Sequence, residues 1–308
     1  MVSAPQRQAK QVSISQPWLT DSVTRRSPLR WRAIGKHAVL LLLCLWVLAP
    51  ISWVLLMSVK SLQESAQRNI WPKTFVSPFY AHYEWVLTAQ RTAGPLFQSL
   101  KNSVMVTSLT VVAATVTAVL GGYALVHLRT PAAKFLTTLL VASLFFPVQV
   151  TAFIGIFSVQ QRLGLINKTW SLMLPYTAIM VAVSIFIMRA AFQTVPTEVI
   201  DSAKLDGASS LRTLTGIVLP LVRNAVVVVI VVNFSAAWGE FLLALSLMND
   251  QDKRTLAVFM AQSSGGLGAL NWPRTAALYV VAIIPSLVIF ALAQNWYMKG
   301  IQEGALKG

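Results

Sequence analysis

Long apolar runs alternate with short polar segments along most of this chain. A helix needs about 20 residues to cross roughly 30 Å of hydrocarbon, and six runs reach that length. Runs of this length are too long for the strands of a barrel, so the pattern predicts an all-α membrane protein. The six expected spans are Ala38–Val59, Ser103–Val126, Phe135–Val159, Trp170–Met188, Ala225–Leu247 and Ala276–Tyr297.

The spans divide the chain into three expected parts. Residues 1–36 form a polar, basic tail, residues 37–298 the six-helix transmembrane domain, and residues 299–308 a second tail. By composition alone, the glycine-rich stretch from Lys299 to Gly308 is a frayed end. Lys60 to Leu100 is expected to be a long loop between the first two spans.

Composition agrees with a membrane protein. Of the 308 residues, 56% are hydrophobic and 11% are charged. The single cysteine, Cys44, lies in an apolar run, and no histidine or cysteine has metal-ligand spacing, so no metal site is expected.

The formal net charge of +15 would favour nucleic acid as a partner of a soluble protein. Here the basic residues lie in tails and loops, where they set membrane orientation. The stretch from Arg25 to Lys36 carries five Lys or Arg residues directly before the first span. We therefore expect both termini, and with them the loop 189–224, to be cytoplasmic.

That loop contains a cluster of charge in a chain whose spans avoid it. Pro196 suits the first turn of a helix, and acids such as Glu198 and Asp201 favour its positive N-terminus. Asp206-Gly207 reads as a stop and turn before a second helix near Ser209. The pattern predicts a short helix, a bend and a helix that re-enters the membrane, a shape suited to docking a soluble partner.

Three motifs in order carry a family resemblance. EVIDSAKLDGASSLRTLTGIVLPL resembles the "EAA" cytoplasmic loop of permease subunits of bacterial ABC importers. WGEFLLALSL, from Trp238, and QNWYMKGIQEGALKG, from Gln294, resemble segments of carbohydrate-importer permeases, most closely the maltose-type second permease subunits. The sequence departs from the family pattern at two places. The three residues after which the EAA loop is named read Asp201-Ser202-Ala203 here, and Gly239 stands where the family usually has Asn.

The resemblance implies a type I ABC importer permease fold and an assembly. The expected partners are a second, different permease subunit, two ATPase subunits that bind ATP and Mg, an extracytoplasmic solute-binding protein and the lipid bilayer of a bacterial inner membrane. No cofactor is expected in this chain itself, and no nucleic acid partner. It also implies ATPase-coupling roles for Glu198, Asp201, Ala203, Asp206, Gly207 and Ala208, and contact of the tail residues Lys299, Gly300 and Gly304 with the ATPases.

A few polar and aromatic residues within the expected spans are candidates for the translocation path. Glu240 either lines a cavity, holds the helix bundle by hydrogen bonds, or is hydrated near the membrane surface. Asn233 either bonds a solute or a neighbouring helix. Trp238 and Tyr176 either stack on a sugar ring or pack against protein and lipid.

The missing motifs exclude other classes. Neither a nucleophile elbow, nor a zinc-protease motif, nor a phosphate loop is present, so we expect no enzyme and an ATPase on another chain. We predict a permease subunit that imports a sugar or sugar-like solute by alternating access. The alternatives are a secondary transporter driven by an ion gradient and an intramembrane enzyme. A secondary transporter would need several intramembrane ionisable groups and a repeat between its two halves.

Overall fold

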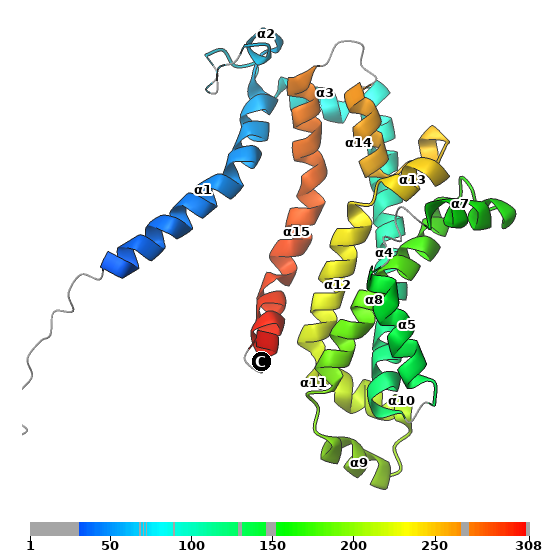
Figure 1. Cartoon of the computed structure of the whole chain (residues 1–308). Coiled ribbons are helices and arrows are strands. Elements are labelled where there is room, and N and C mark those ends of the chain that lie inside the picture. Colours follow the sequence, from blue (N-terminus) through cyan, green and yellow to red (C-terminus); the bar gives the residue numbers. More distant parts are fainter. Residues whose placement is uncertain are drawn as a thin grey trace, which may run out of the picture. The chain divides into compact units, whose positions relative to one another are not determined.

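The structure, a computed structural model, describes residues 31–67, 69, 71, 73–88, 90–128, 131–145, 152–265 and 271–305. These residues are helical or loop, and the extended pairing among them is one isolated antiparallel bridge between Lys60 and Phe75. The chain divides into two compact units, Met1–Ile51 and Ser52–Gly308. The expected all-α architecture is confirmed for the described part (Figure 1).

The first unit contains most of α1 (Trp31–Val59), whose apolar stretch Ile34–Val59 is long enough to cross a membrane. Residues 34–51 of this helix are exposed to the surroundings along all of its faces. A helix that is apolar all round is stable only where its environment is also apolar, as in a bilayer. The first predicted span is confirmed.

In the second unit, three further helices are long and apolar enough to cross a membrane. They contain the stretches Pro95–His127 of α4 (Gln90–His127), Thr169–Phe192 across the 3-10 turn η1 (Thr169–Leu172) and α8 (Met173–Phe192), and Trp272–Gln294 of α15 (Trp272–Ala305). A further apolar helix pair, Ser210–Leu221 and Arg223–Trp238, is bent by 85°, the geometry of a broken span or a re-entrant segment. The second, fourth and sixth predicted spans all fall within these helices.

The remaining two predicted spans differ from expectation. The third, Phe135–Val159, is represented by α5 (Ala133–Phe145) and α7 (Phe153–Arg162), with residues 146–151 outside the described part. The fifth, Ala225–Leu247, is wrong at its C-terminal end, because α12 (Arg223–Trp238) stops at Gly239 and a separate helix, α13 (Leu242–Leu247), follows.

Two segments expected to be irregular are helical. The long loop from Lys60 to Leu100 holds α2 (Leu62–Ser65), α3 (Ala81–Thr88) and the first turns of α4. The expected frayed end is helical as far as Ala305, since α15 continues through Lys299, Gly300 and Gly304. Continuation of an established helix costs little because nucleation has already been completed upstream.

α4 and α8 form the closest helix pair of the second unit. A β-carbon added at Gly122 of α4 would lie 3.0 Å from the Cβ of Met188 and 3.2 Å from the backbone nitrogen of Arg189. A side chain at Gly122 would therefore require a shift of a few tenths of an ångström in α8 where the two helices cross. Tyr123 and Phe192 pack edge to face beside this crossing, and α12 packs against both helices to complete the core.

Hydrogen bonds from asparagine side chains hold together one end of the second unit. This end contains α13, the 3-10 turn η3 (Gln251–Lys253) and α14 (Leu256–Gly265) (Figure 1). Asn167, with φ of 60°, accepts hydrogen bonds through Oδ1 from the backbone N–H groups of Asn249 (2.6 Å) and Asp250 (3.1 Å). Asn102 of α4 donates through Nδ2 to the carbonyls of Asp252 (2.8 Å) and Arg254 (2.9 Å). The connection between α13 and α14 is thus fixed to two other parts of the chain.

Candidate functional site: a capped helix at one end of the bundle

The helix α9 (Thr197–Leu205) lies at the end of the second unit opposite to α3 and α14 (Figure 1). Glu198 lies in its first turn, as predicted, where a carboxylate stabilises the helix N-terminus. Pro196 precedes the helix as its N-cap residue, with φ −58° and ψ 137°, rather than forming its first turn. The short helix is confirmed, with its start one residue later than the proline.

The predicted turn after α9 is confirmed. Gly207 has φ of 76°, its N–H donates to the carbonyl of Lys204 (3.0 Å), and the N–H of Ala208 donates to the carbonyl of Ala203 (2.9 Å). These two bonds make a Schellman motif, which requires a residue in the left-handed conformation immediately after the helix. The exit direction of the chain from α9 is therefore fixed by its own backbone.

A second helical run follows this turn, again as predicted. The Ser209 hydroxyl accepts a hydrogen bond from the Arg212 N–H (3.3 Å) and caps α10 (Ser210–Thr213). The π-helical turn η2 (Leu214–Val218) and α11 (Leu219–Leu221) lead into the bend before α12. Helical turns thus follow one another from Ser210 to Leu221 and reach the bend that leads into α12.

α9 has distinct inner and outer faces. Ile200 and Ala203 are buried, and Ile200 belongs to the hydrophobic core beneath the helix. The methyl group of Ala203 is therefore covered by this chain itself. Glu198, Asp201 and Asp206 are exposed. Asp201 forms an exposed ion pair with Lys204 at 3.1 Å.

The outer face also holds an apolar residue that the charge pattern did not single out. Leu205, at the end of α9, is 90% exposed. Ala208, beyond the turn, is half-buried. Leu205 thus places an apolar side chain among the charged residues of the outer face of α9. The proposed tail contacts at Lys299, Gly300 and Gly304 lie on the last turns of α15, and their side chains are outside the described part.

The candidate path residue Asn233 lies between α12 and α8. It is fully buried, and its Oδ1 accepts a hydrogen bond from the Ser184 hydroxyl (2.9 Å). Of the alternatives open for Asn233, the described residues support the bond to a neighbouring helix.

Glu240 occupies the break between α12 and α13 rather than a continuous span. Its carboxylate accepts hydrogen bonds from the N–H groups of Leu243 (2.8 Å) and Ala244 (3.1 Å), and also from the Tyr176 hydroxyl. The carboxylate therefore caps α13 and ties it to α8. Among the interpretations of Glu240, the hydrogen-bonding one is the one that these contacts support.

The two aromatic candidates are part of the packing. Trp238 stacks on Phe234, with ring centroids 5.5 Å apart and an interplanar angle of 22°, and packs beside Phe259 and Leu278. Tyr176 is 1% exposed and points its hydroxyl to Glu240. Asn167, which closes the other end of the bundle, had no distinguishing signal in the sequence, because an asparagine between two turns is common.

Comparisons with known proteins agree with this geometry. The family model described as "Binding-protein-dependent transport system inner membrane component" matches residues 104–302. The chain is 31% identical to the sulfoquinovosyl glycerol transport system permease protein SmoH of Agrobacterium fabrum, over 85% of this chain and 89% of that protein. It is also 31% identical to the trehalose/maltose transport system permease protein MalG of Thermococcus litoralis, over 68% of this chain and 75% of that protein.

A solved structure shares the fold. A chain in the crystal structure of a bacterial ABC transporter involved in the import of the acidic polysaccharide alginate superposes with a TM-score of 0.74 and 21% identity. The match covers 86% of this chain and 96% of that chain. The helical arrangement is therefore that of an ABC importer permease.

Proposed function

The chain belongs to the family of binding-protein-dependent transport system inner membrane components, and from that premise we propose that it works as one permease half of an ATP-driven importer. A second permease subunit, two ATPase subunits and a solute-binding protein complete the assembly. Family membership and the multi-pass helical fold favour this function over a secondary transporter or an intramembrane enzyme.

The segment from α9 to α12 is the observation that supports an ATPase as the partner. α9 is held from inside by Ile200 and Ala203, and a Schellman motif sets the direction of the chain after it. A push on the outer face of α9 therefore displaces the helical run that leads to α12. This transmission converts closure of a partner into reorientation of a membrane helix.

The outer face of α9 supplies the contacts for such a partner. Leu205 provides an apolar anchor, and the carboxylates of Glu198 and Asp206 provide acceptors for basic groups. Asp201 already pairs with Lys204, so its contribution to docking is smaller. These roles place α9 in the cytoplasm, in line with the five basic residues between Arg25 and Lys36 before the first span. Both termini are then cytoplasmic.

A sugar or sugar-like solute is the proposed cargo. The relatives named above are permeases for sulfoquinovosyl glycerol and for trehalose or maltose, and both belong to this chemical class. In the described part of this chain, Asn233 bonds Ser184 through Oδ1 while its buried Nδ2 has no hydrogen-bond partner, and Trp238 stacks on Phe234. The proposed main source of solute selectivity is the binding protein.

Replacement of Gly207 tests the coupling role, and the chain offers a matched control. Gly207 and Gly164 both have positive φ (76° and 64°), and a β-carbon at either would meet nothing within 4 Å. Alanine at each position costs about 1–2 kcal/mol of backbone strain, without a clash. The strain should be similar at the two positions, but Gly164 follows α7 and is not part of the segment from α9 to α12.

We expect Gly207→Ala to weaken both the co-purification of the ATPase subunits and solute-stimulated ATP hydrolysis. The expected loss is roughly 5- to 30-fold, which is the backbone strain converted to a ratio when all of it opposes the docked conformation. Gly164→Ala should leave both unchanged while lowering thermal stability by a similar amount. Equal loss of coupling in the two variants, or none in Gly207→Ala, would overturn the proposed coupling role.

A further inference from the structure

The segment between Lys60 and Tyr80, directly after α1, folds into a small lobe. It contains α2 and the Lys60–Phe75 bridge, and it lies at the end of the second unit that also holds α3 and α14 (Figure 1). We call the described residues between 60 and 80 the aromatic lobe. Its arrangement of polar and apolar side chains is the reverse of that in a water-soluble domain.

Charged side chains occupy the interior of the aromatic lobe. Lys60 is 1% exposed; its Nζ donates to the carbonyl of Asn69 (2.6 Å) and lies 5.2 Å from the centroid of the Trp53 ring. The carbonyl of Lys60 is 3.0 Å from Nε2 of His82 in α3. A buried lysine is tolerated only when its donors are satisfied, as they are here by a carbonyl and an aromatic face.

Glu64 is the second buried charge, at 3% exposed. Its carboxylate accepts hydrogen bonds from the Lys73 N–H (3.3 Å), Asn69 Nδ2 (3.4 Å) and the Thr74 hydroxyl (3.3 Å). Burial acts to raise the pKa of Glu64, but these hydrogen bonds and the charge of Lys60 hold it below its ordinary value. The lobe is therefore organised around an ionised carboxylate.

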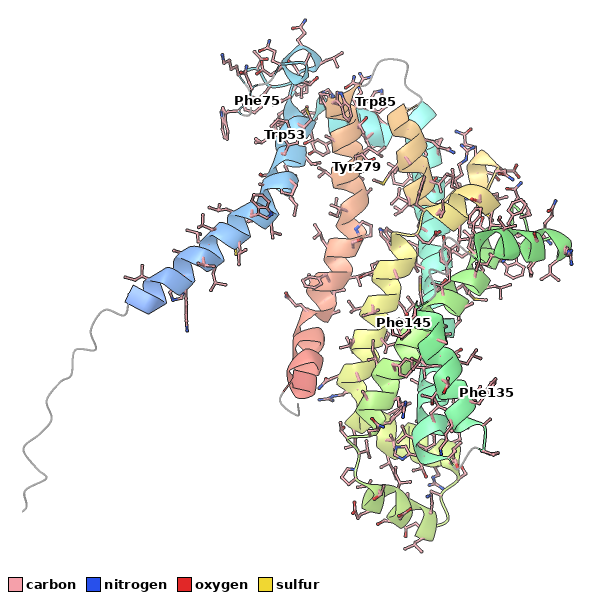
Figure 2. The ribbon with its side chains drawn as sticks, in the orientation of Figure 1. Trp53, Phe75, Trp85, Phe135, Phe145 and Tyr279 are labelled. Carbon is pink, nitrogen blue, oxygen red and sulfur yellow. The ribbon has the colours of Figure 1, made fainter. Side chains whose placement is uncertain are left out.

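Large apolar side chains cover the outside of the same lobe. Trp71 is 70% exposed, Phe79 67%, Phe75 51% and Tyr80 50%. Figure 2 shows Phe75 on the lobe beyond Trp53, and the rings of Phe79 and Tyr80 contact each other edge to face at 5.5 Å. Removal of apolar surface from water is favourable, so four large rings that are half exposed or more leave a stabilisation unrealised in water.

Because charged side chains are buried and aromatic ones are exposed, we infer that the aromatic lobe rests on the lipid bilayer, with its rings at the level of the headgroups. The apolar stretch of α1 ends at Val59, so the lobe begins where the hydrocarbon ends. Trp, Tyr and Phe are the residues that favour this depth, because an apolar ring and a polar edge suit the two sides of the boundary. The exposed Lys73 supplies a cation for lipid phosphate.

The proposal makes the lobe an anchor for the first span. The hydrogen-bonded interior holds the rings in a fixed arrangement, so they enter the interface as a unit without ordering individually. Membrane attachment at this depth fixes how far α1 can slide along the bilayer normal. The inference requires only that the chain spans a membrane, and it stands or falls separately from the coupling role of α9.

Site-specific fluorescence quenching by lipid tests the proposal, because the chain has one native cysteine, Cys44. Single-cysteine variants Phe75→Cys and Phe79→Cys are made with Cys44→Ser, labelled with bimane, and placed as the full complex in nanodiscs of phosphatidylcholine and phosphatidylglycerol. Reactive cysteines of the other subunits are replaced beforehand. Nitroxide-bearing lipids, labelled near the headgroup or near the chain end, serve as quenchers.

Two positions calibrate the measurement. The label on native Cys44, in the middle of the first apolar run, reports deep lipid, and Gln67→Cys reports an exposed polar site on the same lobe. We expect labels at 75 and 79 to lose most of their fluorescence to the headgroup nitroxide and little to the chain-end nitroxide. The label at 67 should lose little to either.

Weak lipid quenching at 75 and 79, equal to that at 67, would overturn the proposal. Protection of these labels from aqueous iodide only when the solute-binding protein is added would also overturn it, since the rings would then dock a protein. Both results leave the Gly207 test unaffected.

Discussion

Removal of one hydroxyl group, in Tyr176→Phe, tests the polar contact that joins α8 to the break between α12 and α13. The Glu240 carboxylate there accepts two backbone N–H groups and the Tyr176 hydroxyl. The substitution leaves the ring and its packing in place. It removes one of the three donors that stabilise the carboxylate.

The expected cost follows from the burial of the pair. A hydrogen bond to a charged group contributes about 1.5–3 kcal/mol, and Tyr176 is 1% exposed, so water has little access to replace the lost donor. At roughly 2–3 °C per kcal/mol, the variant should melt about 3–9 °C below the wild type. Glu240→Gln should cost at least as much, because an amide cannot accept from all three donors.

Thermal unfolding of the detergent-solubilised complex, followed by size-exclusion fluorescence, measures both variants. Tyr80→Phe is the matched control: it deletes the same atom from a half-exposed tyrosine, where the change should stay below about 0.5 kcal/mol. If Tyr176→Phe melted together with Tyr80→Phe, the Glu240 contact would not hold the helices together, and the interpretation of Glu240 as a structural cap would be refuted.

Two further predictions concern pH and packing. Burial is the main reason that the pKa of His82 lies below its ordinary value of 6.5; the contact with Lys60 opposes this, and the charge of Arg274 adds to it. The stability that the neutral ring contributes is therefore complete above pH 6.5 and is lost as the pH falls below it. The stability advantage of the wild type over His82→Gln should shrink between about pH 7.5 and pH 5. A difference that stays constant over this range would contradict the prediction. At the α4–α8 crossing, Gly122→Ala should lower the free energy of unfolding by about 1–2 kcal/mol, because the new methyl group meets backbone. Gly155→Ala, with nothing within 4 Å, should instead raise it by up to about 1 kcal/mol, and equal melting temperatures for the two variants would count against the close approach.

Local chemistry explains which features the sequence could predict. The turn at Asp206-Gly207 and the cap at Ser209 depend on residues within a few positions of each other, and both are confirmed. The long apolar spans are also local features of composition. Such elements can be predicted from sequence because neighbouring residues supply all of their interactions.

Features that depend on distant partners could not be predicted. The end of α12 at Trp238 is not visible in the sequence, because the apolar run continues to Leu247. The helix break depends on Glu240, which caps the next helix and bonds Tyr176, 64 residues earlier. The aromatic lobe reads as a loop because its buried Lys60 and Glu64 resemble solvated charges until their acceptors and donors are known. For Asn233 the sequence left a solute and a neighbouring helix open as partners, because the hydroxyl that it bonds, on Ser184, lies on another helix.

The two hydrogen bonds that Asn102 donates affect the order in which this end of the bundle forms during synthesis. Its acceptors on Asp252 and Arg254 follow it by 150 and 152 residues. At about 5–20 residues per second, a ribosome needs roughly 8–30 s to make that length of chain. During this interval α4 is already available for insertion, while the carbonyls that will hold its Asn102 have not been synthesised. That end of the bundle therefore closes late, after the bent helix pair has been synthesised, and a chain truncated before residue 252 would leave it open.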